Sequence, residues 1–451
     1  MVRVSGFVVS FCLFAMFSFS VVASGHWQDR VVPVSSSAQN VTLFSVVGSN
    51  TVGATLAPAL VQAFLEANGF VDVAIVPTKG ENLQHVEGTW QGEETQFNAR
   101  VTVEAKGSST GFKALSASSA DVAASSRPIK NKEAVALSGL GNMESIDNEH
   151  IVAIDGLAII VSPANPITKL SLKTIQDIFA GKITDWSKVG GPSGKINVLA
   201  RDDKSGTYDT FKRLVLGKAK ISSRATRYES NDHLSATVQK DKNAIGFVAL
   251  PSVRSAKALN VSDGVAKPLS PSVLTVATED YPLSRRLYFY SAEAGKRKEV
   301  VSEFVRFVQS DAGQSVVNQS GYVAQSLFSV PMDNADDPRL ADWNRMNLNI
   351  RFQDNTSSLD NKSLNDVKRL ADFLAQESNR GRKITLVGFS NPFQDVSQSA
   401  LSRLRAQNVR WALRDYGVTN KVITLAGNPV SVADPNSPNA ERNRRVEVWI
   451  K

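Results

Sequence analysis

Short apolar segments alternate with amphipathic ones from about residue 41 to residue 325. Val41–Val47 has the pattern of a strand, a helix follows through Ala67, and Val71–Val76 has the pattern of the next strand. Turn residues such as Gly, Ser and Asn separate these segments. Because a repeat of strand, turn and helix is typical of crossover connections, it predicts α/β sheets that are mainly parallel.

A second pattern begins near residue 346. The polar, acidic segment 329–345 contains two prolines, and we interpret it as a linker after a unit that spans residues 41–328. Residues 346–451 predict the order β-α-β-α-β-β, in which Asp360 or Asn361 caps the first helix and Gly417 follows the second. This is the pattern of a small α+β domain.

Residues 1–24 have the features of a secretory signal peptide. Arg3 supplies a positive charge, the stretch from Gly6 to Val22 is apolar or small, and small residues precede a cleavage point near Ala23 or Ser24. An uncleaved anchor is the alternative, although about 17 residues is short for a membrane span. The sequence therefore predicts export to a bacterial envelope compartment, the periplasm of a Gram-negative cell.

Composition excludes several kinds of site. The only cysteine, Cys12, lies in the predicted signal peptide, so the exported protein would have no thiol for a disulfide, a metal site or a nucleophile. The four histidines are scattered, with no pair three or four residues apart, which argues against zinc. The net charge is +8, and the sequence contains no long run of basic residues. The charge therefore favours an anionic partner without requiring nucleic acid. We expect no metal and no cofactor.

Three segments rich in Gly, Ser and Thr each connect a predicted strand to a predicted helix: Gly48–Gly53, Gly107–Gly111 and Arg201–Thr207. Small residues let the backbone approach a ligand, hydroxyl groups donate hydrogen bonds, and helix N-termini offer free N–H groups. Any one segment is also explained as a Ser or Thr helix cap. The three together, one of them beginning with an arginine, favour a shared oxyanion site at the carboxyl ends of the strands.

These three segments and Ala120–Pro128 resemble, in the same order, the motifs of the periplasmic phosphate-binding proteins of ABC transporters. The resemblance covers roughly residues 41–325. It implies two α/β lobes joined by crossover strands that close on inorganic phosphate like a hinged clamp. It also implies an ABC transporter permease as a partner.

The resemblance further implies which residues bind phosphate. Arg201 is the only full counter-charge among them, and its planar guanidinium suits two phosphate oxygens. Asp203 is expected to hold Arg201 in its orientation, with a surface turn as the alternative. The implied phosphate-binding residues are Thr51, Val52, Ser108, Ser126, Arg201, Ser205, Gly206 and Thr207.

Ser126 departs from the pattern of some family members, which have an aspartate there. A carboxylate accepts the proton of hydrogen phosphate and repels sulfate, whereas a serine both accepts and donates hydrogen bonds. Other branches of the family have serine followed by arginine, as in Ser126–Arg127. We therefore expect the site still to prefer phosphate, and equally tight sulfate binding would contradict this.

The C-terminal segment resembles the OmpA-like peptidoglycan-binding domain, through Leu401–Ala406 and Glu441–Glu447. In that family an aspartate and an arginine hold the diaminopimelate of the wall peptide. The resemblance assigns the arginine to Arg405, but Asn391 replaces the aspartate, so the charge pairing is lost. Peptidoglycan is thus a candidate partner, and a solvated helix face is the alternative for Arg405.

The function that best fits these observations is non-catalytic phosphate binding for uptake or sensing, in a monomeric or weakly associating protein that its C-terminal domain could tether to the wall. A phosphatase is a competing hypothesis, but no Ser–His–Asp motif and no cluster of metal ligands occurs in the sequence. A wall-adhesion protein that has lost its ligand is another, against which the intact Arg201–Thr207 motif argues.

Overall fold

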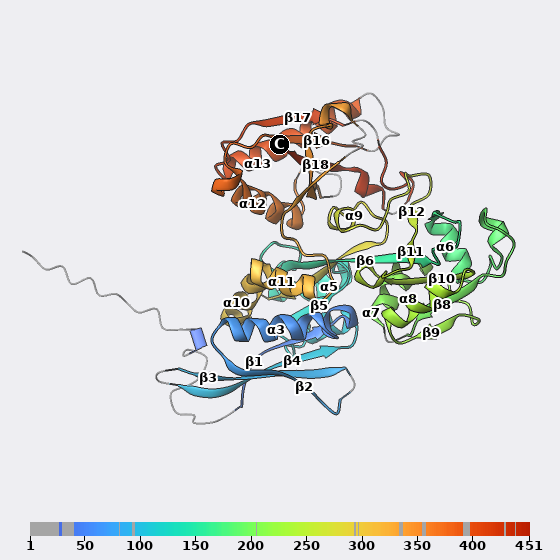
Figure 1. Cartoon of the computed structure of the whole chain (residues 1–451). Helices are drawn as coiled ribbons and strands as arrows, with labels where there is room; N and C mark the ends of the chain where they lie inside the picture. The colour runs from blue at the N-terminus through green and yellow to red at the C-terminus, as the bar shows by residue number, and fades with distance from the viewer. Residues whose placement is uncertain are drawn as a thin grey trace, which may run out of the picture.

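The computed structural model has two α/β lobes beside each other and a C-terminal domain that contacts both of them (Figure 1). The predicted signal peptide lies outside the residues that the structure describes. The described residues are 27–28, 40–80, 82–92, 95–203, 205–292, 295, 297–332, 337–353, 358–390, 397–427, 430–437 and 439–451.

The first lobe is formed by the N-terminal elements and by a segment that returns to it after the second lobe. Its first strand and its long helix α3 confirm the predicted strand Val41–Val47 and the helix through Ala67. Its elements are β1 (Asn40–Gly48), α2 (Asn50–Gly53), α3 (Leu56–Ala67), β2 (Val71–Pro77), β3 (Leu83–Gln91), β4 (Gln96–Ala105), α4 (Ser108–Ser116), β5 (Val122–Ser125), α5 (Asn131–Ala136), β13 (Ser284–Ser291), α10 (Lys298–Gln309) and α11 (Asp311–Gln319).

The second lobe is inserted between these two parts of the first lobe. Its core contains the stacked rings of Phe211 and Phe247, whose centroids are 4.0 Å apart. Its elements are β6 (Glu149–Val161, shared with the first lobe), β7 (Lys169–Ser171), α6 (Leu172–Phe179), β8 (Asn197–Arg201), α7 (Gly206–Phe211), the π-helical turn η3 (Lys212–Leu216), β9 (Thr226–Tyr228), α8 (Asn231–Lys240), β10 (Ala244–Ala249), β11 (Lys257–Ala258), β12 (Asn260–Ser262) and α9 (Val273–Ala277).

One path of paired strands runs through both lobes, in the order β2-β3-β4-β1-β5-β13-β6-β10-β8-β9. Strand β1 is parallel to β4 and β5, and β8 is parallel to β10 and β9, as predicted. In contrast, β2, β3 and β4 are antiparallel, and β13 is antiparallel to β5 and β6. The sheet is therefore mixed rather than mainly parallel; between β3 and β4, for example, too few residues remain for a helical crossover.

Strand β6 connects the two lobes. Its first part pairs with β13, up to Gly156 opposite Ser284, and its last part pairs with β10, from Leu157 opposite Ala249. The returning chain runs beside it, since the N–H of Leu157 donates to the carbonyl oxygen of Leu283 over 3.1 Å. Every residue of β6 after the first is buried. The predicted crossover strands are thus confirmed, and the hinge lies where they pass from one lobe to the other.

The C-terminal domain has the predicted order β-α-β-α-β-β from β15 onward. Asp360 caps its first helix, since its carboxylate accepts the N–H of Ser363 over 2.7 Å. Strand β14 pairs with β15, so the beginning of the predicted linker 329–345 belongs to the sheet of this domain. The elements are β14 (Ser329–Pro331), β15 (Asn344–Arg351), α12 (Asn361–Ala375), β16 (Ile384–Gly388), α13 (Ser397–Asp415), β17 (Val422–Ala426) and β18 (Arg445–Ile450).

Two further properties concern the described residues alone: the apolar length of their helices and the grouping of side chains that bind metals. None of the helices there combines the length and the apolar character that a membrane span requires. The same part of the chain has no cluster of three or more His, Cys, Asp or Glu side chains arranged to hold a metal ion.

Candidate anion site

The loops that follow β1, β4 and β5, which we call the anion loops of the first lobe, meet because these strands are neighbours in the sheet. In the parallel register of β1, Gly48 lies opposite Ala105 of β4 and Ala124 of β5. The carbonyl oxygen of Gly48 accepts the N–H groups of Lys106 (2.8 Å) and Gly107 (2.7 Å). The segments that follow β1, β4 and β5 therefore lie together at the carboxyl edge of the sheet, where ligands bind in open α/β sheets.

Gly48 and Gly111 permit this close packing. Gly48 has a φ of +147°, and a Cβ on it would lie 2.1 Å from the carbonyl oxygen of Ala124. A Cβ on Gly111 would lie 2.4 Å from the carbonyl oxygen of Val47. Larger residues would force these backbone segments apart, so the glycines of the first two motifs have a steric cause.

Ser108 and Ser126 lie beside each other in this group of loops. The N–H of Ser126 donates to Oγ of Ser108 over 3.2 Å, and the two hydroxyl oxygens are 3.5 Å apart. The neighbouring Arg127 forms two hydrogen bonds of 2.8 Å with the carboxylate of Glu133. Although burial raises the pKa of Glu133, the hydrogen bond from Arg127 leaves it below its ordinary value. The charge of Arg127 is thus balanced within the first lobe.

Arg201 ends strand β8, and the chain next to it holds its guanidinium. Nε donates to the carbonyl oxygen of Tyr228 (3.2 Å), and Nη2 donates to that of Glu229 (2.5 Å). Nη1 donates to Oγ1 of Thr207 over 3.4 Å. The residue is only 9% exposed, and this burial lowers its pKa. All three of these acceptors are neutral, although the charges of Asp202 and Glu229 also act on the guanidinium and raise its pKa against the effect of burial.

The prediction that Asp203 orients Arg201 is wrong. Asp203 forms an ion pair with Arg227 of β9, and its side chain is 83% exposed. The guanidinium of Arg227 also lies over the ring of Tyr208, 4.3 Å from its centroid. Backbone carbonyls perform the orienting role instead, and no side-chain motif indicates them in advance.

The loops of the two lobes meet at a cavity of about 270 Å³. The hydroxyl of Thr51 donates to the carbonyl oxygen of Gly206 across the gap between the lobes, over 3.3 Å. The volume suffices for a tetrahedral oxyanion with accompanying water. From the predicted set, Thr51, Arg201, Ser205, Gly206 and Thr207 line the cavity, together with Asp155 and Tyr322. The other three predicted residues, Val52, Ser108 and Ser126, are not among the described residues that line the cavity.

Arg285 joins the loop that contains Thr51 to the loop that contains Gly206, and no anion-site motif in the sequence includes it. Nη2 of Arg285 donates to Oγ1 of Thr51 (2.7 Å) and to the carbonyl oxygen of Gly206 (3.3 Å). Its Nε donates to Oδ2 of Asp155 over 3.1 Å, and the two side chains are 3% and 7% exposed. Arg285 lies 234 positions after Thr51, so no spacing rule links them. One signal in the sequence is the stretch Tyr281–Tyr288, which contains Arg285 and also resembles the periplasmic phosphate-binding proteins.

Tyr322 fixes the backbone of the first loop from a third direction. Its hydroxyl donates to the carbonyl oxygen of Thr51 over 2.7 Å. Thr51 is therefore held through its side chain by Arg285 and through its carbonyl by Tyr322. This arrangement orients the threonine before any ligand binds, which lowers the entropic cost of binding.

Replacing Gly206 by alanine is expected to weaken anion binding at least about tenfold, or 1.4 kcal/mol. A Cβ at this position would lie 2.7 Å from Cα of Thr51 and 2.9 Å from its Oγ1, so the lobes could not approach as they do now. Calorimetric titration with phosphate measures the change. Gly139→Ala is the matched control, because a Cβ there meets no atom within 4 Å. Equal affinities of the two variants would contradict this role of the contact.

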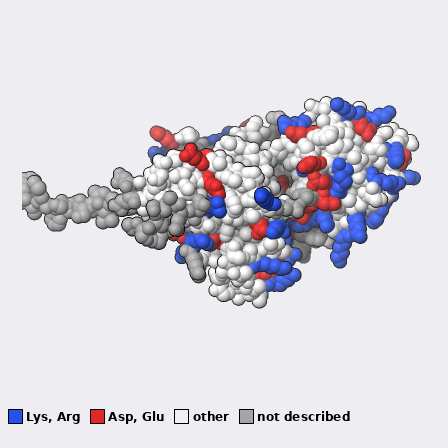
Figure 2. All heavy atoms as spheres, turned by 90° about the horizontal axis from the view of Figure 1, so that it is seen from below, with Lys and Arg blue, Asp and Glu red and all other residues white. Residues whose placement is uncertain are grey.

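Basic side chains gather over the end of the molecule that the second lobe forms, on the face seen from below (Figure 2). Such a surface raises the local concentration of anions and increases their association rate. The sign of this surface therefore suits an anionic ligand that enters between the lobes.

Arg405 of the C-terminal domain lies beside the end of β16. Its Nη1 donates to the carbonyl oxygen of Phe389 (3.1 Å) and to Oγ of Ser390 (2.9 Å). The residue is 8% exposed, and burial together with the nearby charge of Arg444 lowers its pKa. Asn391, the other residue predicted for wall-peptide binding, lies outside the described residues. Arg405 is thus buried beside the end of β16, and the alternative of a solvated helix face is wrong.

Both parts of the chain resemble known proteins. Residues 84–312 match the PBP superfamily domain, and residues 351–445 match the OmpA family. The phosphate-binding protein PstS of Staphylococcus epidermidis is 31% identical over 250 residues, which cover 53% of this chain and 75% of that protein. The phosphate-binding protein PstS of Borreliella burgdorferi is 28% identical over 235 residues, covering 50% and 80%. A solved possible phosphate binding protein from Planctomyces limnophilus matches with a TM-score of 0.50 and 28% identity, over 64% of this chain and 94% of that one.

Proposed function

Because this chain belongs to the PBP superfamily, among relatives that are PstS phosphate-binding proteins, we propose that it binds inorganic phosphate between its two lobes. The observation that carries the proposal is the meeting of Thr51 and the Arg201–Thr207 loop at one cavity. Arg201 supplies the counter-charge, and the hydroxyl groups of Thr51, Ser205 and Thr207 supply neutral donors. Charge-assisted hydrogen bonds contribute about 1.5–3 kcal/mol each, so a few of them offset the desolvation of the anion.

Two loops of the first lobe complete the proposed site when the clamp closes fully. Ser108, Ser126 and the N–H of Val52 belong to the predicted set but do not line the present cavity. They lie at the carboxyl edge of the same sheet as Thr51, and the proposed rotation at the hinge moves the second lobe with its bound anion toward them. The side chain of Val52 is fully buried, which leaves only its backbone for this role.

Preference for phosphate over sulfate follows from the acceptors of the site. A serine at position 126 does not by itself reject sulfate, but the carboxylate of Asp155 lines the cavity. A carboxylate accepts the proton of hydrogen phosphate, whereas sulfate has no proton to donate. Titration calorimetry with phosphate and then sulfate, on protein stripped of anions, tests the proposal. We expect one-to-one phosphate binding that excess sulfate does not displace, and no heat with phosphate would refute it.

The C-terminal match to the OmpA family supports tethering of the protein to peptidoglycan. Arg405 is the residue proposed to bind the wall peptide, with Asn391 as its partner. Co-sedimentation with purified peptidoglycan sacculi tests this, with Arg405→Ala as the variant expected to remain in the supernatant. Sedimentation of both proteins to the same extent would show that Arg405 is not required.

The relatives are binding proteins, and we propose that this chain likewise performs no catalysis and uses no cofactor. Its proposed location is outside the cytoplasm, after removal of residues 1–24. Delivery of phosphate to an ABC transporter permease is the proposed role in uptake, and nucleic acid is not a proposed partner. Hydrolysis of a chromogenic phosphate ester above background would instead favour the phosphatase alternative.

A further inference from the structure

Adjacent arginines of strand β13 serve the anion site and the C-terminal domain. Arg285 contacts Thr51 and Asp155 at the cavity, as described above. Arg286 forms two hydrogen bonds with Glu279 (2.7 and 2.9 Å) and an ion pair with Asp360 of the C-terminal domain (2.9 Å). Successive side chains of a strand point to opposite faces, so one strand carries both contacts. A displacement of Arg286 therefore moves the backbone that positions Arg285.

The C-terminal domain also binds the backbone of the hinge segment, which we define as Thr278–Arg286. Nη1 of Arg442 donates to the carbonyl oxygen of Tyr281 (2.8 Å), and its Nη2 donates to that of Ser284 (3.1 Å). Nη2 of Arg351 donates to the carbonyl oxygen of Thr278 over 2.9 Å. This segment is the returning crossover between the lobes, so the C-terminal domain is attached to the moving part of the clamp.

Further contacts join the C-terminal domain to each lobe. On the side of the first lobe, Nδ2 of Asn361 donates to the carbonyl oxygen of Glu144 (2.9 Å) and to Oε1 of Glu149 (3.2 Å). On the second lobe, Oδ2 of Asp263 accepts hydrogen bonds from Oγ of Ser437 (2.7 Å) and from Nδ2 of Asn439 (3.1 Å). A domain that is bound to both lobes and to the hinge restricts their relative rotation.

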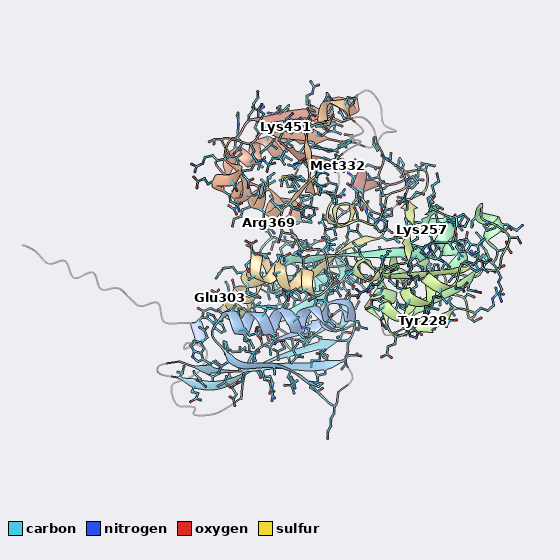
Figure 3. All side chains as sticks on the ribbon, in the orientation of Figure 1. Tyr228, Lys257, Glu303, Met332, Arg369 and Lys451 are labelled. Atoms are coloured by element: carbon cyan, nitrogen blue, oxygen red, sulfur yellow. The ribbon has the colours of Figure 1, made fainter. Side chains whose placement is uncertain are left out.

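A second connection leads from this interface to the loop after Ser126. The carboxylate of Glu149, which contacts Asn361, also accepts the hydroxyl of Tyr290 over 2.8 Å. The oxygen of Tyr290 in turn accepts the N–H of Ile129 over 3.1 Å. Arg369 lies on the side of the C-terminal domain that faces the lobes, whereas Lys451 lies farther from them (Figure 3). The interface is thus connected to the loop after Ser126 and, through Arg285, to Thr51 and Gly206.

We propose that the C-terminal domain regulates the phosphate site, and that Arg286, Asp360 and Arg442 are positioning residues for it. The docked domain stabilises the arrangement in which Thr51 contacts Gly206, so weakening the interface weakens phosphate binding. By thermodynamic reciprocity, bound phosphate strengthens docking of the domain. A wall peptide that changes the docking of this domain would change phosphate affinity by the same route. This inference rests on the proposed phosphate binding.

The test compares the phosphate affinity of the full-length exported protein with that of interface variants. Asp360→Asn removes the charge that faces Arg286 but keeps a good helix cap, and Arg442→Gln removes the bonds to the hinge segment. We expect the dissociation constant for phosphate to rise at least about fivefold in Arg442→Gln and further in the double variant, within the usual range for coupled sites. Asp342→Asn is the control, because it removes a carboxylate that pairs with Lys451 at an exposed position.

Hydrogen exchange on the unmodified protein gives an independent measurement. Phosphate is expected to slow hydrogen exchange in the hinge segment and in β15 of the C-terminal domain. This result does not depend on any substitution. Unchanged affinity in the variants, or unchanged exchange at the interface while wild-type protein binds phosphate, would overturn the coupling alone. Absence of phosphate binding by the wild-type protein would overturn the proposed function and the coupling together.

Discussion

Replacing Arg201 by alanine is expected to weaken phosphate binding at least about 100-fold, a loss of about 3 kcal/mol. Arg201 is the only arginine or lysine among the predicted anion-binding residues, and its described hydrogen-bond acceptors are two carbonyl oxygens and one hydroxyl. Its removal takes away the charge and at least one charge-assisted hydrogen bond to the anion. Isothermal titration of the variant with phosphate measures the loss.

Arg227→Ala is the matched control for this experiment. Arg227 lies on the adjacent strand β9 and carries the same charge, but it pairs with Asp203 rather than facing the cavity. The control is expected to bind phosphate within about threefold of the wild type, since surface ion pairs contribute little. If both variants lost affinity equally, the effect would come from net charge and not from the site.

Replacing Arg285 by methionine is expected to lower the free energy of unfolding of the two lobes by about 3–5 kcal/mol, because it leaves the buried carboxylate of Asp155 without its ion partner. Thr51 loses its donor at the same time, so phosphate affinity falls as well. Denaturant unfolding measures the loss of stability of the lobes. Native-state hydrogen exchange in β6 and β13 measures it locally. Titration calorimetry measures the loss of affinity.

A double-mutant cycle separates the ion pair from the packing of the side chain. Asp155→Asn combined with Arg285→Met removes both charges, and the double variant is expected to be clearly more stable than the sum of the single effects predicts. Phosphate affinity is not expected to recover in the double variant, since the contact to Thr51 remains absent. Strictly additive losses of stability would mean that Asp155 and Arg285 do not act as a pair.

Much of the local structure could be predicted because it depends on neighbouring residues. The helix that follows Asp360 begins where a capping carboxylate precedes an amphipathic pattern, and the structure has that cap. The sequence also predicts the role of the motif glycines, since Gly48 and Gly111 allow neighbouring backbone segments to pack closely. The sequence does not predict the hairpin of β3 and β4, whose antiparallel pairing, like that of β13 with β5 and β6, makes the sheet mixed.

The candidate site divides along the same line. Thr51, Arg201 and Ser205 lie in motifs that recur in a family, so each could be named from a few adjacent residues. The partners of Arg201 are backbone carbonyls on a neighbouring strand, and every residue has a carbonyl, so no residue type indicates them. For that reason Asp203 was a plausible but wrong choice.

The amino-acid sequence by itself therefore determined many of the strands and helices, the glycine-rich loops and the chemical groups that an anion would meet. Those properties arise from side-chain periodicity, helix capping and steric limits, which act over a few residues. Only the tertiary structure decided that Arg285 reaches Thr51 and that Arg442 binds the hinge segment. These contacts depend on how the two crossovers and three domains pack, and packing is a property of the whole chain that no local pattern encodes.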